Sequence, residues 1–228
     1  MRVADYLMSR LADAGAEHVF LLPGGGAMYL NDALVCEKRL VPVPCHHEQA
    51  CGIAAEAWGR IRETFGVCMV TTGPGATNAI TPVAGAWIES TPLLVISGQV
   101  KRSDQLAGRP LRQGGVQEVD IVPIVKSITK YAVTVNDPQQ IRYHLERALH
   151  EMKDGRNGPV WLDIPLDVQA ATVNPETLPK FTPAPQAKQD LAAAAAQLMA
   201  LIGQAKHPLL LAGHGVRLAG AVVGIVKA

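Results

Sequence analysis

An excess of charge of either sign is missing from this sequence, as are long apolar runs. Its 21 lysines and arginines balance 20 aspartates and glutamates, which leaves a formal net charge of +1. Such a protein creates no strong field for a polyanion, so we expect no nucleic acid partner. No apolar run reaches the roughly 20 residues that cross a bilayer, so no membrane contact is expected. The first residues lack a secretory signal pattern, which predicts a cytoplasmic protein.

Cysteines and aromatic residues are also scarce. The four cysteines form no C-x-x-C pair, and a zinc site built from Cys45, His46, His47 and Cys51 would not match the usual ligand spacing. No metal site is therefore predicted. Aromatic residues make up only 4% of the chain against 48% hydrophobic residues. The core should therefore consist of Ala, Val, Leu and Ile, as in layered α/β proteins.

Short apolar runs alternate with segments of helical periodicity. Strands are expected at residues 18–22, 40–43, 67–71, 93–97, 131–135 and 159–164, and helices at 3–14, 27–36, 48–62, 76–87 and 138–152. Buried strands that alternate with helices predict a doubly wound α/β fold, in which helices cover both faces of a parallel sheet. Residues 99–115 interrupt the pattern with a polar loop of a length that is often functional.

Proline marks a change of organisation after residue 170. Residues 171–187 contain four prolines and no apolar period, which predicts a linker that follows a first domain at residues 1–170. Residues 188–228 are then the incomplete start of a second α/β domain, with a helix at 190–202 and a strand at 207–212. About 40 residues are too few for an independent core.

Two glycine-rich turns follow predicted strands, namely Pro23-Gly24-Gly25-Gly26 and Thr72-Gly73-Pro74-Gly75. In an open α/β sheet, ligands gather outside the carboxyl ends of the strands, so both turns should line one rim. Neither turn matches a known phosphate-binding pattern, and two interpretations stay open: a phosphate-binding loop or a tight turn. Thr77 and Asn78 either face the same site or cap the following helix.

Glu48 begins a predicted helix that is rich in small apolar residues. A carboxylate in this position is a candidate for proton transfer. It would also stabilise the helix dipole in a purely structural role. We expect Ala50, Ile53 and Ala54 to surround Glu48 and remove it from water, because they follow it in the sequence.

Several motifs occur in a characteristic order. They are His47-Glu48-Gln49 before a helix that ends in Trp58-Gly59-Arg60, the run from Thr71 to Asn78 (TTGPGATN), residues 92–99 (PLLVISGQ), residues 116–120 (VQEVD) and residues 158–165 (GPVWLDIP). Together they resemble the N-terminal pyrimidine-binding domain of thiamine-diphosphate enzymes. Within that group, the sequence is most similar to the large subunit of acetolactate synthase, also called acetohydroxyacid synthase.

The resemblance implies a function for the residues singled out above. In such enzymes, the glutamate that matches Glu48 bonds a pyrimidine nitrogen of thiamine diphosphate and promotes loss of the thiazolium proton. The residues that match Gln117 and the two glycine turns lie at the reaction centre and at the pyrimidine end of the cofactor. The implied reaction is a decarboxylating carboligation of 2-oxo acids, which joins pyruvate to a second pyruvate or to 2-oxobutyrate.

The resemblance also implies that part of the site is elsewhere. The family binds the diphosphate and Mg²⁺ through a Gly-Asp-Gly motif, which is absent here, so Mg²⁺ and FAD are expected only for a full-length enzyme. The expected state is a fragment that acts as a homo-oligomer or with a chain carrying the diphosphate-binding domain. Gly114-Gly115 and Val116 depart from the pattern of acetolactate synthases, so two alternatives stay open: another 2-oxo acid decarboxylase or carboligase, or a non-catalytic interaction module.

Overall fold

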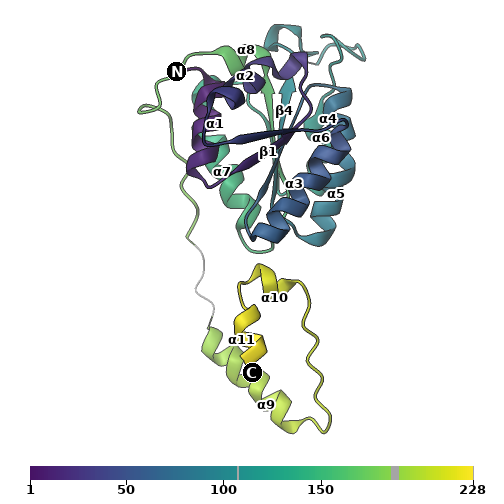
Figure 1. Cartoon of the computed structure of the whole chain (residues 1–228), viewed down its shortest axis with the longest axis vertical. Helices are drawn as coiled ribbons and strands as arrows, with labels where there is room; N and C mark the ends of the chain where they lie inside the picture. Colours follow the sequence, from purple (N-terminus) through teal and green to yellow (C-terminus); the bar gives the residue numbers. More distant parts are fainter. Residues whose placement is uncertain (107, 186–189, 228) are drawn as a thin grey trace. The chain divides into compact units, whose positions relative to one another are not determined.

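The computed structural model describes residues 1–106, 108–185 and 190–227, of which residues 225–227 by backbone alone. Residues 186–189, where the predicted linker ends and the second domain begins, and one position of the predicted loop lie outside these ranges. The chain divides into two units, Met1–Phe181 and Thr182–Ala228 (Figure 1), each treated by itself below. No helix within the described ranges is long and apolar enough to cross a membrane.

The first unit is built on a six-stranded sheet with the order β2-β1-β3-β4-β6-β5. All neighbouring strands are parallel. The strands are β1 (His18–Leu21), β2 (Val41–Pro44), β3 (Gly66–Val70), β4 (Leu93–Gln99), β5 (Tyr131–Thr134) and β6 (Val160–Pro165). The apolar runs of β3, β4 and β6 are buried along their whole length, as a parallel sheet with two covered faces requires.

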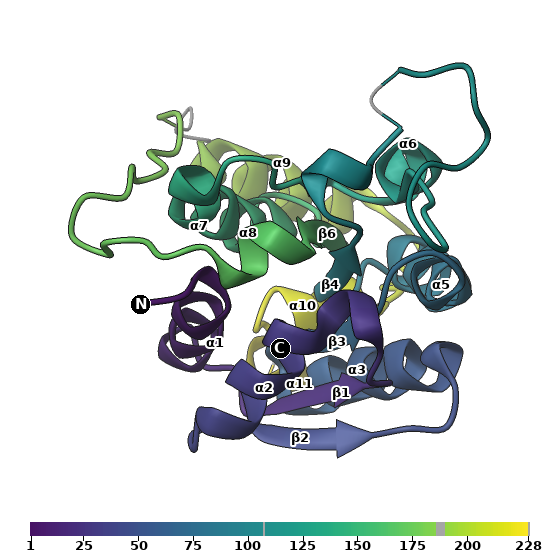
Figure 2. The ribbon, with the colours of Figure 1, turned by 90° about the horizontal axis from the view of Figure 1, so that it is seen from above.

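Helices cover both faces of this sheet (Figure 2). One face carries α1 (Val3–Asp13), α2 (Met28–Cys36), α7 (Ile141–Lys153) and α8 (Leu166–Ala170); the other carries α3 (Glu48–Arg62), α4 (Pro74–Asn78), α5 (Ile80–Glu89) and α6 (Ile121–Val125). The described residues of this unit also form short 3-10 helices: η1 (Gly25–Ala27), η2 (Arg102–Asp104), η3 (Lys126–Ile128) and η4 (Pro138–Gln140). The predicted doubly wound α/β fold is confirmed, although the helix expected at 76–87 is divided between α4 and α5.

The strand order reverses between β1 and β3. The chain leaves β1 towards α2 on one face of the sheet, whereas it leaves β3 towards α4 on the other face. The two connections therefore diverge at the carboxyl ends of adjacent strands. Such a reversal is the usual position of a ligand site in open α/β sheets.

Strand β3 lies very close to helix α3, and Gly66 permits this approach. A Cβ atom at Gly66 would overlap the carbonyl oxygen of Ala55, which belongs to the helix backbone and cannot rotate away. We expect Gly66→Ala to lower the free energy of unfolding by about 2 kcal/mol, within the range for overpacked cores. Urea unfolding checks this, with Gly25→Ala as the control because no atom lies within 4 Å of its Cβ position. Equal effects of the two substitutions would contradict the explanation.

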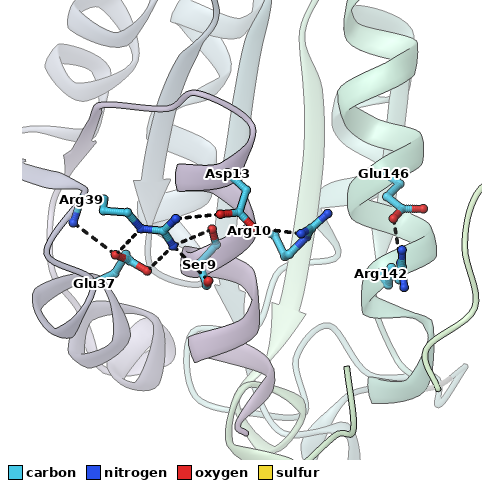
Figure 3. Close-up of polar contacts among 7 residues, drawn as sticks. All are labelled: Ser9, Arg10, Asp13, Glu37, Arg39, Arg142 and Glu146. Atoms are coloured by element: carbon cyan, nitrogen blue, oxygen red, sulfur yellow. Dashed lines mark hydrogen bonds and ion pairs between the residues drawn. The ribbon is translucent and has the colours of Figure 1, made fainter. Parts of the chain in front are cut away.

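Arginine side chains connect elements on the surface near α1 (Figure 3). The Arg39 guanidinium bonds Asp13 at 2.7 Å and Ser9 at 3.1 Å in α1, and Glu37 at 2.8 Å in the loop before β2. Arg142 and Glu146 form a separate pair within α7 at 2.7 Å. The charged groups around Arg39 are mostly solvent-exposed, so they fix the path of this loop more than they stabilise the fold.

The first part of the predicted linker packs against the first unit. Val3 N–H donates to Ala171 O, and Val173 N–H donates to Met1 O, both at 2.9 Å. Val173 and Leu178 are buried among core residues. Residues 171–181 are therefore an ordered strap across the N-terminal segment. The remaining domain assignments stay predictions.

The second unit contains α9 (Leu191–Gln204), α10 (Gly215–Leu218) and α11 (Val222–Lys227). The helix expected at 190–202 is confirmed. The strand expected at 207–212 is wrong: this segment has no strand partner among the described residues, and Leu209 and Leu211 are each 90% exposed. An apolar run predicts a strand only where a neighbouring strand can pair with its backbone.

Candidate functional site

The two predicted glycine turns meet at the carboxyl ends of β1 and β3. A Cβ atom at Gly24 would lie 2.5 Å from Thr71 Cβ, and one at Gly26 would lie 2.8 Å from Thr72 Cγ2. Gly26 N–H also donates to Thr71 Oγ1 at 3.0 Å. Gly24 and Gly26 therefore need to be glycines because the two turns touch.

Glu48 lies above the second glycine turn. It is the first residue of α3 and only 7% exposed. Asn78 Nδ2 donates to Glu48 Oε2 at 2.9 Å, and a Cβ atom at Gly75 would lie 3.4 Å from Oε1. Oε1 accepts no hydrogen bond from any residue that the structure describes. The carboxylate is thus held by one oxygen and offers the other.

The residues that bury Glu48 differ from those expected. Ala50 is exposed and Ile53 is 52% exposed, whereas Cys51 and Gly52 are buried along with Glu48. Positions three and four residues apart share a face of an α-helix, so Ile53 points away from Glu48. The expectation that Ala50 and Ile53 surround Glu48 is therefore wrong, whereas Ala54 is half-buried and packs against the core on this face of the sheet.

The side chains of Thr77 and Asn78 have different contacts. Thr77 Oγ1 donates to Pro74 O at 3.2 Å within its own helix, whereas Asn78 reaches Glu48. The N-terminus of α3 is capped by His47, whose Nδ1 accepts the Gln49 N–H at 3.0 Å. Asn78 therefore belongs to the candidate site, while Thr77 is engaged locally.

Gln117 lies against the second glycine turn. A Cβ atom at Gly73 would overlap the carbonyl oxygen of Gln117 and lie 3.1 Å from its Cβ. Both residues have left-handed backbones, with φ of +58° at Gln117 and +60° at Gly73. Left-handed backbone is uncommon for a residue other than glycine, so the surrounding loop must hold Gln117 in place.

Glu118, which no sequence pattern distinguishes, organises that loop. Its Oε1 accepts the Leu106 N–H at 2.6 Å, and its Oε2 accepts the N–H groups of Gly114 and Gly115 at 2.7 and 3.0 Å. Burial alone would raise the pKa of Glu118, but these backbone donors outweigh it and hold the pKa below its usual value. One carboxylate thus connects the middle and the end of the polar loop predicted at residues 99–115.

We expect Glu118→Gln to loosen this loop. The amide has one acceptor oxygen instead of two and no charge, so the free energy of unfolding at pH 7 should fall by about 1–2 kcal/mol. Because the pKa of Glu118 is lowered in the folded state, the difference should shrink as the pH falls through that pKa. Urea unfolding measures this, with Glu89→Gln on α5 as an exposed control. A difference independent of pH would contradict the explanation.

A metal site is not assembled from the residues considered above. The described residues contain no group of three or more His, Cys, Asp or Glu side chains that could hold a metal ion. Burial and the neighbouring Cys45 raise the pKa of the Cys51 thiol to about 12, so Cys51 stays protonated. A protonated thiol is a poor metal ligand.

A buried polar network, which the sequence did not reveal either, lies beneath the glycine turn. Thr72 Oγ1 donates to Gln99 Oε1 at 2.9 Å. Gln99 Nε2 donates to Val119 O at 2.8 Å and to Asp163 Oδ2 at 3.0 Å. Asp163 also accepts hydrogen bonds from Ser97 Oγ at 2.6 Å and Thr134 Oγ1 at 3.2 Å, and burial raises its pKa to about 7.

Comparison with known proteins agrees with this geometry. Residues 1–124 match the family described as "Thiamine pyrophosphate enzyme, N-terminal TPP binding domain". The chain belongs to this family. The match contains Glu48, both glycine turns and Gln117, and it confirms the resemblance found in the sequence.

Relatives of the chain are acetolactate synthases. The chain is 37% identical to the acetolactate synthase large subunit of Corynebacterium glutamicum, over 95% of this chain and 34% of that protein. It is 36% identical to the mitochondrial acetolactate synthase of Schizosaccharomyces pombe, over 88% of this chain and 30% of that protein. For the chloroplastic acetolactate synthase of Arabidopsis thaliana the identity is 36%, over 93% of this chain and 31% of that protein. The chain spans about a third of the length of these relatives.

Proposed function

We propose that this chain supplies the pyrimidine half of a thiamine-diphosphate site for acetolactate-synthase-like carboligation. The observation that carries the proposal is the buried carboxylate of Glu48, held by Asn78 above Gly75 with one oxygen open. The proposed substrates are 2-oxo acids, namely pyruvate with a second pyruvate or with 2-oxobutyrate.

The residues present fit the pyrimidine half of this cofactor. Gly73 and Gly75 carry no side chain beneath Glu48, which leaves backbone as the nearest surface for a flat ring. Pro23 to Gly26, Thr72 and Pro74 would lie around the same ring, and Gln117 would face the reaction centre. Bound thiamine diphosphate supplies a nucleophilic carbon and an electron sink. Glu48 would hold a proton between Oε1 and a pyrimidine nitrogen.

The remainder of the site is proposed to come from a partner. The Gly-Asp-Gly motif that binds the diphosphate and Mg²⁺ in this family does not occur in the sequence. We propose a homo-oligomer, or a complex with a chain carrying the diphosphate-binding domain, and we assign Mg²⁺ and FAD to the full-length enzyme. The cytoplasmic location stays a prediction.

Calorimetry and a product assay test this proposal. The purified chain alone should bind thiamine diphosphate with Mg²⁺ weakly or undetectably. Mixed with a separately produced diphosphate-binding domain of the family, it should bind the cofactor and convert pyruvate to acetolactate. Tight binding of thiamine diphosphate by the chain alone would contradict the proposal that it supplies only half of the site. Binding without turnover in the mixture would contradict the enzymatic function and favour a non-catalytic module.

A further inference from the structure

The Gln99 side chain connects two segments that are distant in the sequence. It forms four hydrogen bonds, to Thr72 Oγ1, Val100 N–H, Val119 O and Asp163 Oδ2. Thr72 begins the second glycine turn, and Val119 follows Gln117 by two residues. We propose that Gln99 is a positioning residue that couples the glycine turn to the segment that presents Gln117. The proposal rests on the proposed function insofar as these segments line the cofactor site.

The hydrogen-bonding capacity of a primary amide matches this position. The Gln99 oxygen accepts from Thr72 and Val100, while its NH₂ group donates to a carbonyl and a carboxyl oxygen. Gln99 is 4% exposed, so water cannot easily replace a lost partner. A buried group left without its partner costs more than the bond contributes. No apolar side chain could form hydrogen bonds with both segments.

The partners of Gln99 fix which way its amide points. An amide rotated by 180° would place its oxygen against Asp163 and Val119 O, and its NH₂ group against the Val100 N–H, so that like groups would face each other. Asp163 itself is held by Ser97 Oγ, which in turn accepts the Trp161 Nε1–H at 2.8 Å. The orientation of Gln99 is therefore set by the core of the sheet, and both segments follow it.

A direct contact supports the coupling. The Gln117 carbonyl lies against Gly73, one residue beyond Thr72, and Gln117 has a left-handed backbone. Displacing Thr72 would move the surface on which Gln117 rests. Releasing Val119 would free the strained residue from the other side. One side chain thus sets the distance between the turn below Glu48 and the loop of Gln117.

Hydrogen–deuterium exchange of the purified chain, without cofactor, tests the proposal. Gln99→Met removes all four bonds at similar volume, and we expect exchange about tenfold faster at residues 72–78 and at residues 116–120, in line with about 1.4 kcal/mol. Within residues 116–120, the amide to follow is the Glu118 N–H, which donates to Gly115 O. Thr72→Val removes only the donor of the turn, yet it should accelerate exchange at residues 116–120 as well. Thr72→Ser restores a hydroxyl donor and should restore the protection of both segments.

The matched control is Gln169→Met. Gln169 is also buried, but its Nε2 donates to Gly26 O and Ile164 O at 2.7 and 2.8 Å. This variant should leave residues 116–120 unchanged. The proposal is overturned if Thr72→Val affects residues 72–78 alone, or if Gln99→Met accelerates exchange equally throughout the first unit. Should Gln99→Met not fold, the two Thr72 variants decide. Because no cofactor is used, the result is independent of whether the chain binds thiamine diphosphate.

Discussion

Replacing Glu48 with Gln should lower the turnover of the reconstituted enzyme about 10²- to 10⁴-fold, the range for loss of a positioned acid–base group. A glutamine fits the same volume, and its oxygen can still accept the Asn78 Nδ2–H. It cannot hold and release a proton at Oε1. The fold should therefore survive while proton transfer fails. Acetolactate formed from pyruvate, in the mixture with the diphosphate-binding domain, is the measurement.

Glu56→Gln is the matched control for this experiment. Glu56 lies on the same helix, about two turns from Glu48, where it accepts a hydrogen bond from Thr91 at 3.3 Å and contacts Arg60. The same chemical change there should leave turnover within about twofold of the unchanged chain. If Glu48→Gln retained normal turnover, the role assigned to Glu48 would be wrong. The unfolding free energies of the two variants should also be compared. If Glu48→Gln is no less stable than Glu56→Gln, its loss of turnover is not due to unfolding.

Replacing Asp163 with Asn should remove most of a pH dependence of stability. Burial raises the pKa of Asp163 from 3.8 to about 7, so the folded chain holds this proton more tightly than the unfolded chain. The stabilisation is complete below the unfolded pKa and is lost as the pH rises through the folded pKa. Between pH 5 and pH 8 the unchanged chain should lose about 3 kcal/mol of unfolding free energy from this group.

The difference between the two chains isolates Asp163 from other titrating groups. The asparagine side chain carries no charge at any pH, so the curve of Asp163→Asn should lack the decline that Asp163 causes in the unchanged chain. His144 contributes to the pH dependence of stability with the opposite sign in both chains, because burial and Arg147 lower its pKa. Urea unfolding at several pH values provides the curves. Parallel curves for the two chains would show that Asp163 does not titrate in this range.

Local sequence patterns predicted most of the first unit. The apolar runs that became β3, β4 and β6 are buried on both sides, and such runs carry their own signal. Both glycine turns were located because they follow strands, and parallel strands bring their carboxyl ends to one rim. The second unit shows where such patterns fail, since the run at residues 207–212 has the composition of a strand but nothing to pair with among the residues that the structure describes.

The parts that were missed depend on distant contacts. Glu118 and Gln99 read as ordinary polar residues, and their importance comes from partners 12 and 27 residues away. Asp163 lies in an apolar strand, where only the folded sheet brings Ser97 and Thr134 to it. The sequence alone suggests that its neighbours bury Glu48, because it does not reveal which face of α3 is packed. Pairings across elements leave no periodic trace in the sequence.

The first residues of the strap lie beside the N-terminus of the first unit. Residues Met1 and Val173 pair their backbones, and Arg2 forms an antiparallel bridge with Thr172. Adjacent ends allow a domain to be circularly permuted or inserted into a host protein without distortion. A linker that returns from Phe181, which contacts Tyr143 and His150 of α7, to residue 1, with new termini opened at the exposed Gly155 loop, should therefore give a folded permutant. The first unit should therefore fold as an independent domain when it is inserted into other proteins.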